Sequence, residues 1–146
     1  MPTVGKLQLN PGTAQHPESG YRSRFSHQNE FAEAGYYKVK LEDYNIWAEM
    51  TATTRVGFHQ YTFPKSTQSH IIFDLNAGIY NYDDKNTWTY VRVVNDTLVT
   101  GYRQTRGWAR NRTVYFAMTF SKPFKNYGQK NEDGQVDYKG SVSYTH

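Results

Sequence analysis

The polar stretch of residues 21–41 holds most of the side chains in this chain that are suited to binding a ligand. Charged and polar residues follow one another in it with few apolar residues between them, and the strand-like run YYKVKL begins directly after Gly35. Such side chains form paired hydrogen bonds with hydroxyl groups, as sugar recognition requires. The alternative is a network of ion pairs inside the domain or against a neighbouring domain. The candidates are Arg24, His27, Asn29 and Glu30.

A second candidate is the loop of residues 105–111, in which Trp108 stands between Arg106 and Arg110. A tryptophan ring offers a broad apolar face with a polar N–H at its edge, so it can stack on the C–H side of a sugar. The same properties suit a residue that anchors a core or an interface. The sequence leaves both interpretations of Trp108 open.

Catalysis by this chain alone is not indicated. Glycoside hydrolysis requires two carboxyl groups, one protonated and one ionised. The chain has 13 Asp and Glu residues, and no surrounding motif marks any of them; the nearest candidates are Glu30, Glu33 and Glu49. The chain also contains no GxSxG, P-loop or GxGxxG motif. We therefore predict no catalytic residue here.

Metal binding is not indicated either. The five histidines form no HxxxH or HxH pair, so zinc is not expected. Residues 82–86, YDDKN, offer oxygen ligands, but they lack the twelve-residue spacing and final glutamate of a calcium loop. We interpret them as a polar turn.

The length and charge of the chain limit its domain number and its possible partners. A chain of 146 residues suits one domain, residues 1–146, with one core. The net charge is only +4 and the basic residues are scattered, so a nucleic-acid-binding barrel is a weak alternative and we predict no nucleic-acid partner. There is no cysteine, signal peptide or long apolar run, so no disulfide and no membrane partner is predicted.

The apolar pattern favours an all-β fold. No segment keeps a helical period over three turns, and residues 29–34 have room for one helical turn at most. About eight short strands recur every 8–12 residues, which is typical of an antiparallel β-sandwich. Residues 70–75 form an apolar run typical of a central strand covered on both faces, and a tight hairpin turn is expected at Asn95-Asp96. The expected strands are 36–41, 46–53, 55–63, 70–75, 88–94, 97–104 and 112–121, with a weaker terminal strand pair or edge at 136–144 and at most one short lead-in strand near 6–9.

Several segments resemble the amino-terminal domain of glycoside hydrolase family 92. They are MPTVG at residues 1–5, SRFSHQNE at 23–30, GYYKVKL at 35–41, AEMTATTRVGFHQYTFP at 48–64 and GWARNRTVYFAMTFSKPF at 107–124. The resemblance implies a β-sandwich that packs on a helical (α/α)6 catalytic domain of a calcium-dependent, inverting exo-α-mannosidase from glycan-digesting bacteria. It also implies a periplasmic or secreted location.

In that family the catalytic acid, the base and most calcium ligands come from the helical domain. The resemblance therefore implies that this chain is an incomplete sandwich from a larger enzyme, inactive alone and with no cofactor of its own. Its partners would be α-mannoside glycans and the helical domain. Arg24, His27, Glu30 and Trp108 are expected near the junction of the two domains. The alternative is an independent, lectin-like carbohydrate-binding module.

Overall fold

The computed structural model describes residues 1–77, 85–130, 136–138 and 143–145. The chain divides into two compact units, Met1–Phe73 and Asp74–His146, which are described separately below. The described residues form twelve β-strands and two short 3-10 helices. None of the described helices has the length and apolarity needed to cross a membrane. The single domain of residues 1–146 stays a prediction.

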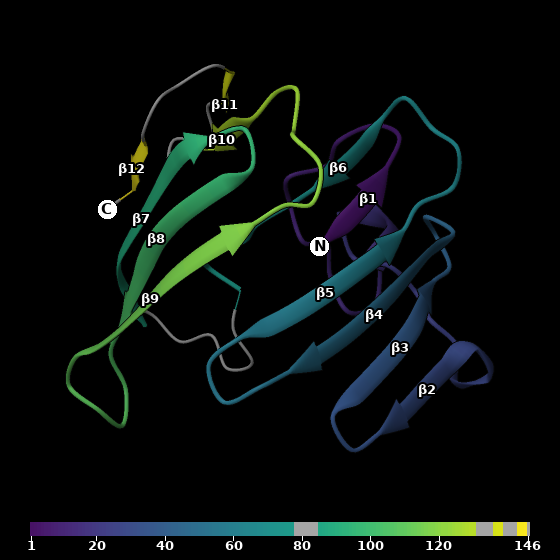
Figure 1. The fold of residues 1–146 in the computed structure, drawn as a ribbon, viewed down its shortest axis with the longest axis horizontal. Coiled ribbons are helices and arrows are strands. Elements are labelled where there is room, and N and C mark those ends of the chain that lie inside the picture. Colours follow the sequence, from purple (N-terminus) through teal and green to yellow (C-terminus); the bar gives the residue numbers. More distant parts are fainter. Residues whose placement is uncertain (78–84, 131–135, 139–142, 146) are drawn as a thin grey trace. The chain divides into compact units, whose positions relative to one another are not determined.

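The main sheet of the first unit is a four-stranded antiparallel meander, ordered β2-β3-β4-β5 (Figure 1). Two special backbone positions make its turns possible. Gly35 takes φ +84° between β2 and β3, and Asn45 takes φ +51° just before β4. Glycine and asparagine are the residues that tolerate this left-handed conformation best. The strands are β2 (Glu30–Glu33), β3 (Tyr36–Leu41), β4 (Ile46–Ala52) and β5 (Gly57–Thr62).

One face of this sheet contains the core of the first unit. Val39 pairs with Ala48 and Leu41 with Ile46, so these side chains share a face. Val39 and Ala48 are buried, and Ile46 is fully buried. The predicted alternation of residues 36–41 and 46–53 is confirmed by this burial pattern.

Residues 29–34 stay within the expected limit of one helical turn at most. A 3-10 helix, η2, spans His27–Asn29, and the chain then enters strand β2 at once. Glu30 pairs with Val39 and Glu33 with Tyr36 in the β2–β3 hairpin. Pairing with β3 makes residues 30–33 a strand, which the sequence pattern did not predict.

The prediction of a central strand at residues 70–75 is wrong. Only Ser69–Ile71 form a strand, β6, and it pairs with β1 (Pro2–Val4) in a two-stranded sheet. Ile71 and Phe73 are 42% and 46% exposed, so the run is not covered on both faces. A short apolar run does not by itself establish two-sided burial. The lead-in strand expected near residues 6–9 lies instead at Pro2–Val4.

The second unit contains another four-stranded antiparallel sheet, ordered β12-β7-β8-β9 (Figure 1). The expected tight turn at Asn95-Asp96 is confirmed: the Asn95 side-chain oxygen accepts hydrogen bonds from the backbone and hydroxyl of Thr97 at 2.9 and 3.0 Å. A small hairpin, β10–β11, completes the described part of the unit. The strands are β7 (Asn86–Asn95), β8 (Leu98–Thr105), β9 (Arg112–Thr119), β10 (Gly128–Lys130), β11 (Val136–Tyr138) and β12 (Ser143–Thr145).

The predicted all-β antiparallel class is confirmed, and two four-stranded sheets are consistent with a β-sandwich. The sequence indicated about eight strands and the structure describes twelve. β2 and β10 were not expected and β1 lies outside the expected 6–9, whereas β11 and β12 correspond to the terminal strand pair expected at 136–144. Each of these strands has only three or four residues, too few to show a clear period of two in the sequence.

Candidate functional site

The segment from Tyr21 to Glu30 runs from a buried anchor to the start of β2. Tyr21 is 8% exposed, and its backbone N–H donates to the carbonyl of Asn10 at 2.8 Å. Beyond this anchor, most side chains of the segment are exposed or half-exposed. The first unit therefore presents the polar segment on its surface while holding its beginning in the core.

Arg24 forms an ion pair with Asp43. Its backbone N–H donates to Asp43 Oδ2 at 2.8 Å, and its Nε and Nη2 donate to Oδ1 at 2.9 and 2.5 Å. In return, the Asp43 N–H donates to Ser23 Oγ at 3.1 Å, and the Glu42 N–H donates to the Arg24 carbonyl at 3.0 Å. Hydrogen bonds from Arg24 lower the pKa of the Asp43 carboxyl below its ordinary value. Arg24 thus fastens the segment to the β3–β4 turn.

His27 and Glu30 meet because the η2 turn brings them together. Ser26 caps this turn by accepting from the Gln28 N–H at 3.3 Å. His27 Nδ1 then lies 2.5 Å from Glu30 Oε2, and the Tyr37 hydroxyl donates to Glu30 Oε1 at 2.5 Å. Tyr37 reaches Glu30 because Glu30 pairs with Val39, two residues further along β3 on the same face.

These contacts keep Glu30 ionised. The hydrogen bond from Tyr37, and then that from His27, lowers the pKa of Glu30 below its ordinary value of 4.5. The same bond to Glu30 raises the pKa of Tyr37. A catalytic acid in glycoside hydrolysis needs a raised pKa, so Glu30 has the wrong shift for that role.

His27 and Phe25 form an exposed pair beside this carboxylate. Their rings meet edge to face with centroids 5.6 Å apart. The His27 side chain is 88% exposed and Phe25 is 52% exposed. Glu30 contacts Nδ1 of the imidazole, and the Phe25 ring lies next to it. This arrangement can stack on an apolar surface and hydrogen-bond to a hydroxyl at the same time.

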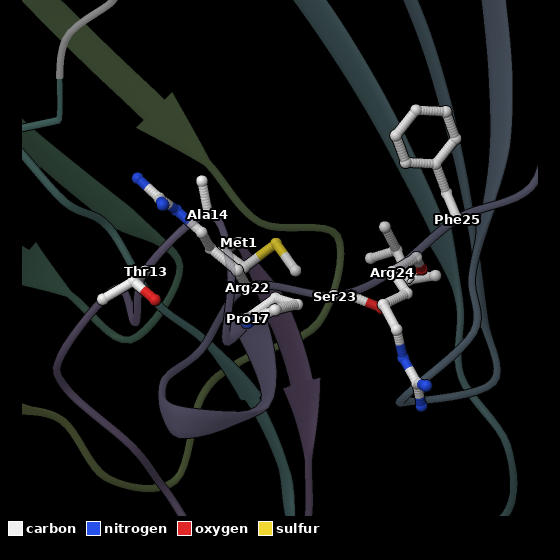
Figure 2. Close-up of a pocket in the computed structure, with 9 residues that line it drawn as sticks. Met1, Thr13, Ala14, Pro17, Arg22, Ser23, Arg24 and Phe25 are labelled. Carbon is white, nitrogen blue, oxygen red and sulfur yellow. Dashed lines mark hydrogen bonds between the residues drawn. The ribbon is translucent and has the colours of Figure 1, made fainter.

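An open depression of about 550 Å³ lies on one side of the segment (Figure 2). In Figure 2 the Arg24 guanidinium points away from the side chains around Met1 and Pro17. Among the described residues, the Arg22 guanidinium has no hydrogen-bond or ion-pair partner, so it is a cation available to an incoming acidic or hydroxyl group. The depression is lined by Met1, Thr13, Ala14, Pro17, Arg22, Ser23, Arg24, Phe25 and Leu41.

Trp108 lies in the second unit, in the loop between β8 and β9, and its side chain is fully exposed. The interpretation of Trp108 as a core anchor is therefore wrong, whereas contact with a sugar or with another domain stays a prediction. Of the three predicted site residues in the first unit, His27 and Glu30 are in direct contact. Arg24 turns to Asp43, as the alternative of ion pairs inside the domain supposed.

The other two candidate carboxylates of the first unit do not lie beside Glu30. Glu33 and Glu49 lie on the face of the sheet opposite to Glu30. Glu49 accepts from the Tyr36 hydroxyl at 2.5 Å and lies 3.7 Å from Lys38 Nζ. In the part of the chain that the structure describes, no three His, Asp or Glu side chains cluster as metal ligands would. Residues 82–84 of the polar turn at 82–86 lie outside the described residues.

Sequence reasoning missed Asp43 and Tyr37, the two residues that organise the segment. Asp43 is 19 positions from Arg24, and its turn gave no sign of a distant partner. Tyr37 had a detectable signal: a hairpin centred on Gly35 would have placed it diagonally across from Glu30.

The Glu30 contacts predict a pH-dependent stability. Because the pKa of folded Glu30 is below 4.5, its ionised form stabilises the fold above that pH, and the stabilisation is lost as the pH falls through the lowered value. Urea unfolding should therefore show Glu30→Gln less stable than wild type at pH 7, with the difference shrinking at lower pH. Glu33→Gln is the matched control, since among described residues Glu33 has no hydrogen-bond partner. A Glu30→Gln difference that stays constant at every pH would contradict this account.

The chain is similar to a known protein family and to solved structures. Residues 1–146 match the family described as "Glycosyl hydrolase family 92 N-terminal domain". Two solved structures, of the family GH92 α-mannosidase BT3965 from Bacteroides thetaiotaomicron alone and in complex with mannoimidazole, are similar to the chain. Each is 33% identical, with a TM-score of 0.83 over 97% of this chain. The chain spans only 20% of the length of those structures. Comparison with the curated proteins gives no match.

Proposed function

We propose that this chain, which belongs to the family of glycosyl hydrolase family 92 N-terminal domains, is the N-terminal domain of an exo-acting α-mannosidase. The observation that carries the proposal is the likeness to an α-mannosidase at 33% identity along 97% of the chain, with a TM-score of 0.83. Since the chain corresponds to one fifth of that enzyme, the chemistry is assigned to the remainder of a parent protein.

In this proposal the domain shapes the mannose-binding pocket and supplies no acid or base. It packs against a helical (α/α)6 domain, and the pocket lies at the junction. The exposed Phe25–His27 pair and the exposed Trp108 are suited to contact sugar or the helical domain. Arg24 and Glu30 act as positioning residues. The Arg24 side chain is paired with Asp43, and the Glu30 carboxylate is hydrogen-bonded to His27 and Tyr37.

The acid, the base and most of the calcium ligands belong to the helical domain in this proposal. One observation supports the assignment of the catalytic acid: the pKa of Glu30 is lowered rather than raised. Calcium would assist the reaction by distorting the bound mannose, and the reaction would invert the anomeric configuration. The described residues do not fit a calcium site, so no step is assigned to them.

We further propose that the parent enzyme acts in bacterial glycan degradation, in the periplasm or outside the cell. Its substrates would be α-mannoside glycans. The likeness to an α-mannosidase from Bacteroides thetaiotaomicron supports the bacterial origin and the mannoside substrates. No location follows from the chain's own composition.

A second candidate function is an independent carbohydrate-binding module. The full exposure of Trp108 favours it, because a solvent-facing indole is a common way to bind a sugar ring. In this case Trp108→Ala would abolish glycan binding by the chain.

The proposal predicts that the chain alone releases no mannose from an aryl α-mannoside, with or without calcium. The reason is that the chain corresponds to one fifth of the similar enzyme, and that the lowered pKa of Glu30 is opposite to the shift a catalytic acid needs. Release of mannose can be measured by absorbance of the freed aryl group. Turnover by the chain alone that Glu30→Gln or Glu49→Gln abolishes would contradict the proposal and place the reaction on its own carboxylates.

A further inference from the structure

The sheet face opposite the core of the first unit carries a set of aromatic and planar polar side chains. The strand register places Tyr36, Thr51 and Phe58 in one row across β3, β4 and β5. Lys38, Glu49 and Gln60 form the next row. This surface, the outer face, carries four aromatic rings from four strands: Phe31, Tyr36, Trp47 and Phe58.

Three of the four rings already have partners within the outer face. The Lys38 ammonium lies 4.9 Å from the centre of the Trp47 ring. Phe31 and Tyr36 are tilted against each other at 6.1 Å. Phe58 is 64% exposed and has no aromatic partner among the described residues. It is therefore the ring of this face that is available to stack on a ligand.

A depression of about 170 Å³ lies next to Phe58. Ordinary small-molecule pockets have roughly 300–1,000 Å³, so this one has room for about one sugar ring and not for a larger compound. It is lined by Tyr36, Glu49, Met50, Thr51, Phe58 and Gln60.

The polar groups of the depression have unused hydrogen-bonding capacity. Both contacts to Glu49 use Oε1, from the Tyr36 hydroxyl and the Lys38 ammonium. Its Oε2 and the Gln60 amide have no described partner. A carboxylate and an amide are planar groups that can each engage two neighbouring hydroxyls, as on a pyranose ring.

The charge of the outer face suits a neutral ligand. Lys38 and Lys40 contribute two positive charges, and Glu33 and Glu49 contribute two negative charges. Their sum is zero, so neither a polyanion nor a polycation is attracted over a distance.

We propose that the depression beside Phe58 is a glycan-binding subsite for one neutral pyranose ring, separate from the depression near Arg22. The sugar stacks on Phe58 and its hydroxyls bond with Glu49 and Gln60. Such a subsite would hold a glycan chain near the enzyme without taking part in hydrolysis. Only the choice of mannan as the first probe rests on the proposed function.

Affinity electrophoresis of the chain tests this inference. The chain is run through native gels with and without soluble α-mannan, and a β-glucan gel is run in parallel. We expect retardation in at least one polysaccharide, and we expect Phe58→Ala and Gln60→Ala each to weaken the apparent affinity about tenfold. Tyr115→Ala is the matched control, since Tyr115 is an exposed aromatic residue, 75% accessible, on the other unit. Circular dichroism checks that each variant folds.

Three other outcomes overturn the subsite. Wild-type mobility that neither polysaccharide changes would exclude glycan binding by this face. Retardation that Trp108→Ala abolishes and Phe58→Ala leaves intact would place the sugar on the Trp108 loop. Sedimentation that shows self-association, lost in Phe58→Ala, would identify a second copy of the chain as the occupant. Retardation by β-glucan alone would support the subsite and count against the mannoside specificity of the proposed function.

Discussion

Replacing Ile46 by alanine is expected to lower the free energy of unfolding by about 3–4 kcal/mol, the usual cost of truncating a fully buried isoleucine. Ile46 begins β4, pairs with Leu41 and has no exposed surface. It is the one large side chain that is fully buried among the described residues. A small domain is stable by only about 5–15 kcal/mol, so this loss is a large part of the total.

Urea unfolding followed by tryptophan fluorescence measures the Ile46→Ala effect. Val56→Ala is the matched control, since Val56 is 61% exposed. Its expected change is within about 0.5 kcal/mol. Equal effects of the two substitutions would show that the β2–β5 sheet is not organised around Ile46.

Gly101→Ala is expected to cost about 3 kcal/mol, because a new methyl group has no space in the sheet of the second unit. A Cβ at Gly101 would lie 2.1 Å from the Tyr90 carbonyl oxygen and 2.6 Å from Phe116 Cζ. The phenyl ring can move, but the carbonyl belongs to β7, which pairs with β8 along most of its length. The substitution therefore forces the two strands apart and weakens hydrogen bonds between them.

The same unfolding assay tests Gly101→Ala, with Gly57→Ala as the control. A Cβ at Gly57 would come no closer than 3.6 Å to any atom of the surroundings. Alanine there is expected to be neutral or slightly stabilising, because glycine loses more backbone entropy on folding. A Gly101→Ala protein as stable as wild type would mean that β7 and β8 can adjust at no cost.

The sequence predicted strands best where one face is buried. Residues 36–41 and 46–53 alternate because Val39, Ile46 and Ala48 enter a core, and burial gives the alternation a period of two. The apolar run at 70–75 was wrongly predicted to be a covered central strand, because it has no such alternation to test the assignment. Its environment depends on β1, a three-residue partner nearly seventy positions away, which local patterns do not reveal.

The sequence predicted which residues form the candidate site, but it did not predict which residues they contact. Residue types identified the segment around Arg24, His27 and Glu30, whereas their partners depend on turn geometry and strand register. The ion pair of Arg24 with Asp43 needs the β3–β4 turn, and the contact of Glu30 with Tyr37 needs the β2–β3 register. The absence of a catalytic pair in this chain stays a prediction.

The measurement that tests the central claim most directly is a titration of this chain into a fixed amount of the helical domain of its parent enzyme. Mannose release from an aryl α-mannoside is followed with calcium present. We predict no release by either part alone and activity in the mixture that rises and saturates at one chain per helical domain. Full activity of the helical domain alone, with no change on adding the chain, would contradict the claim that this domain completes the mannose pocket.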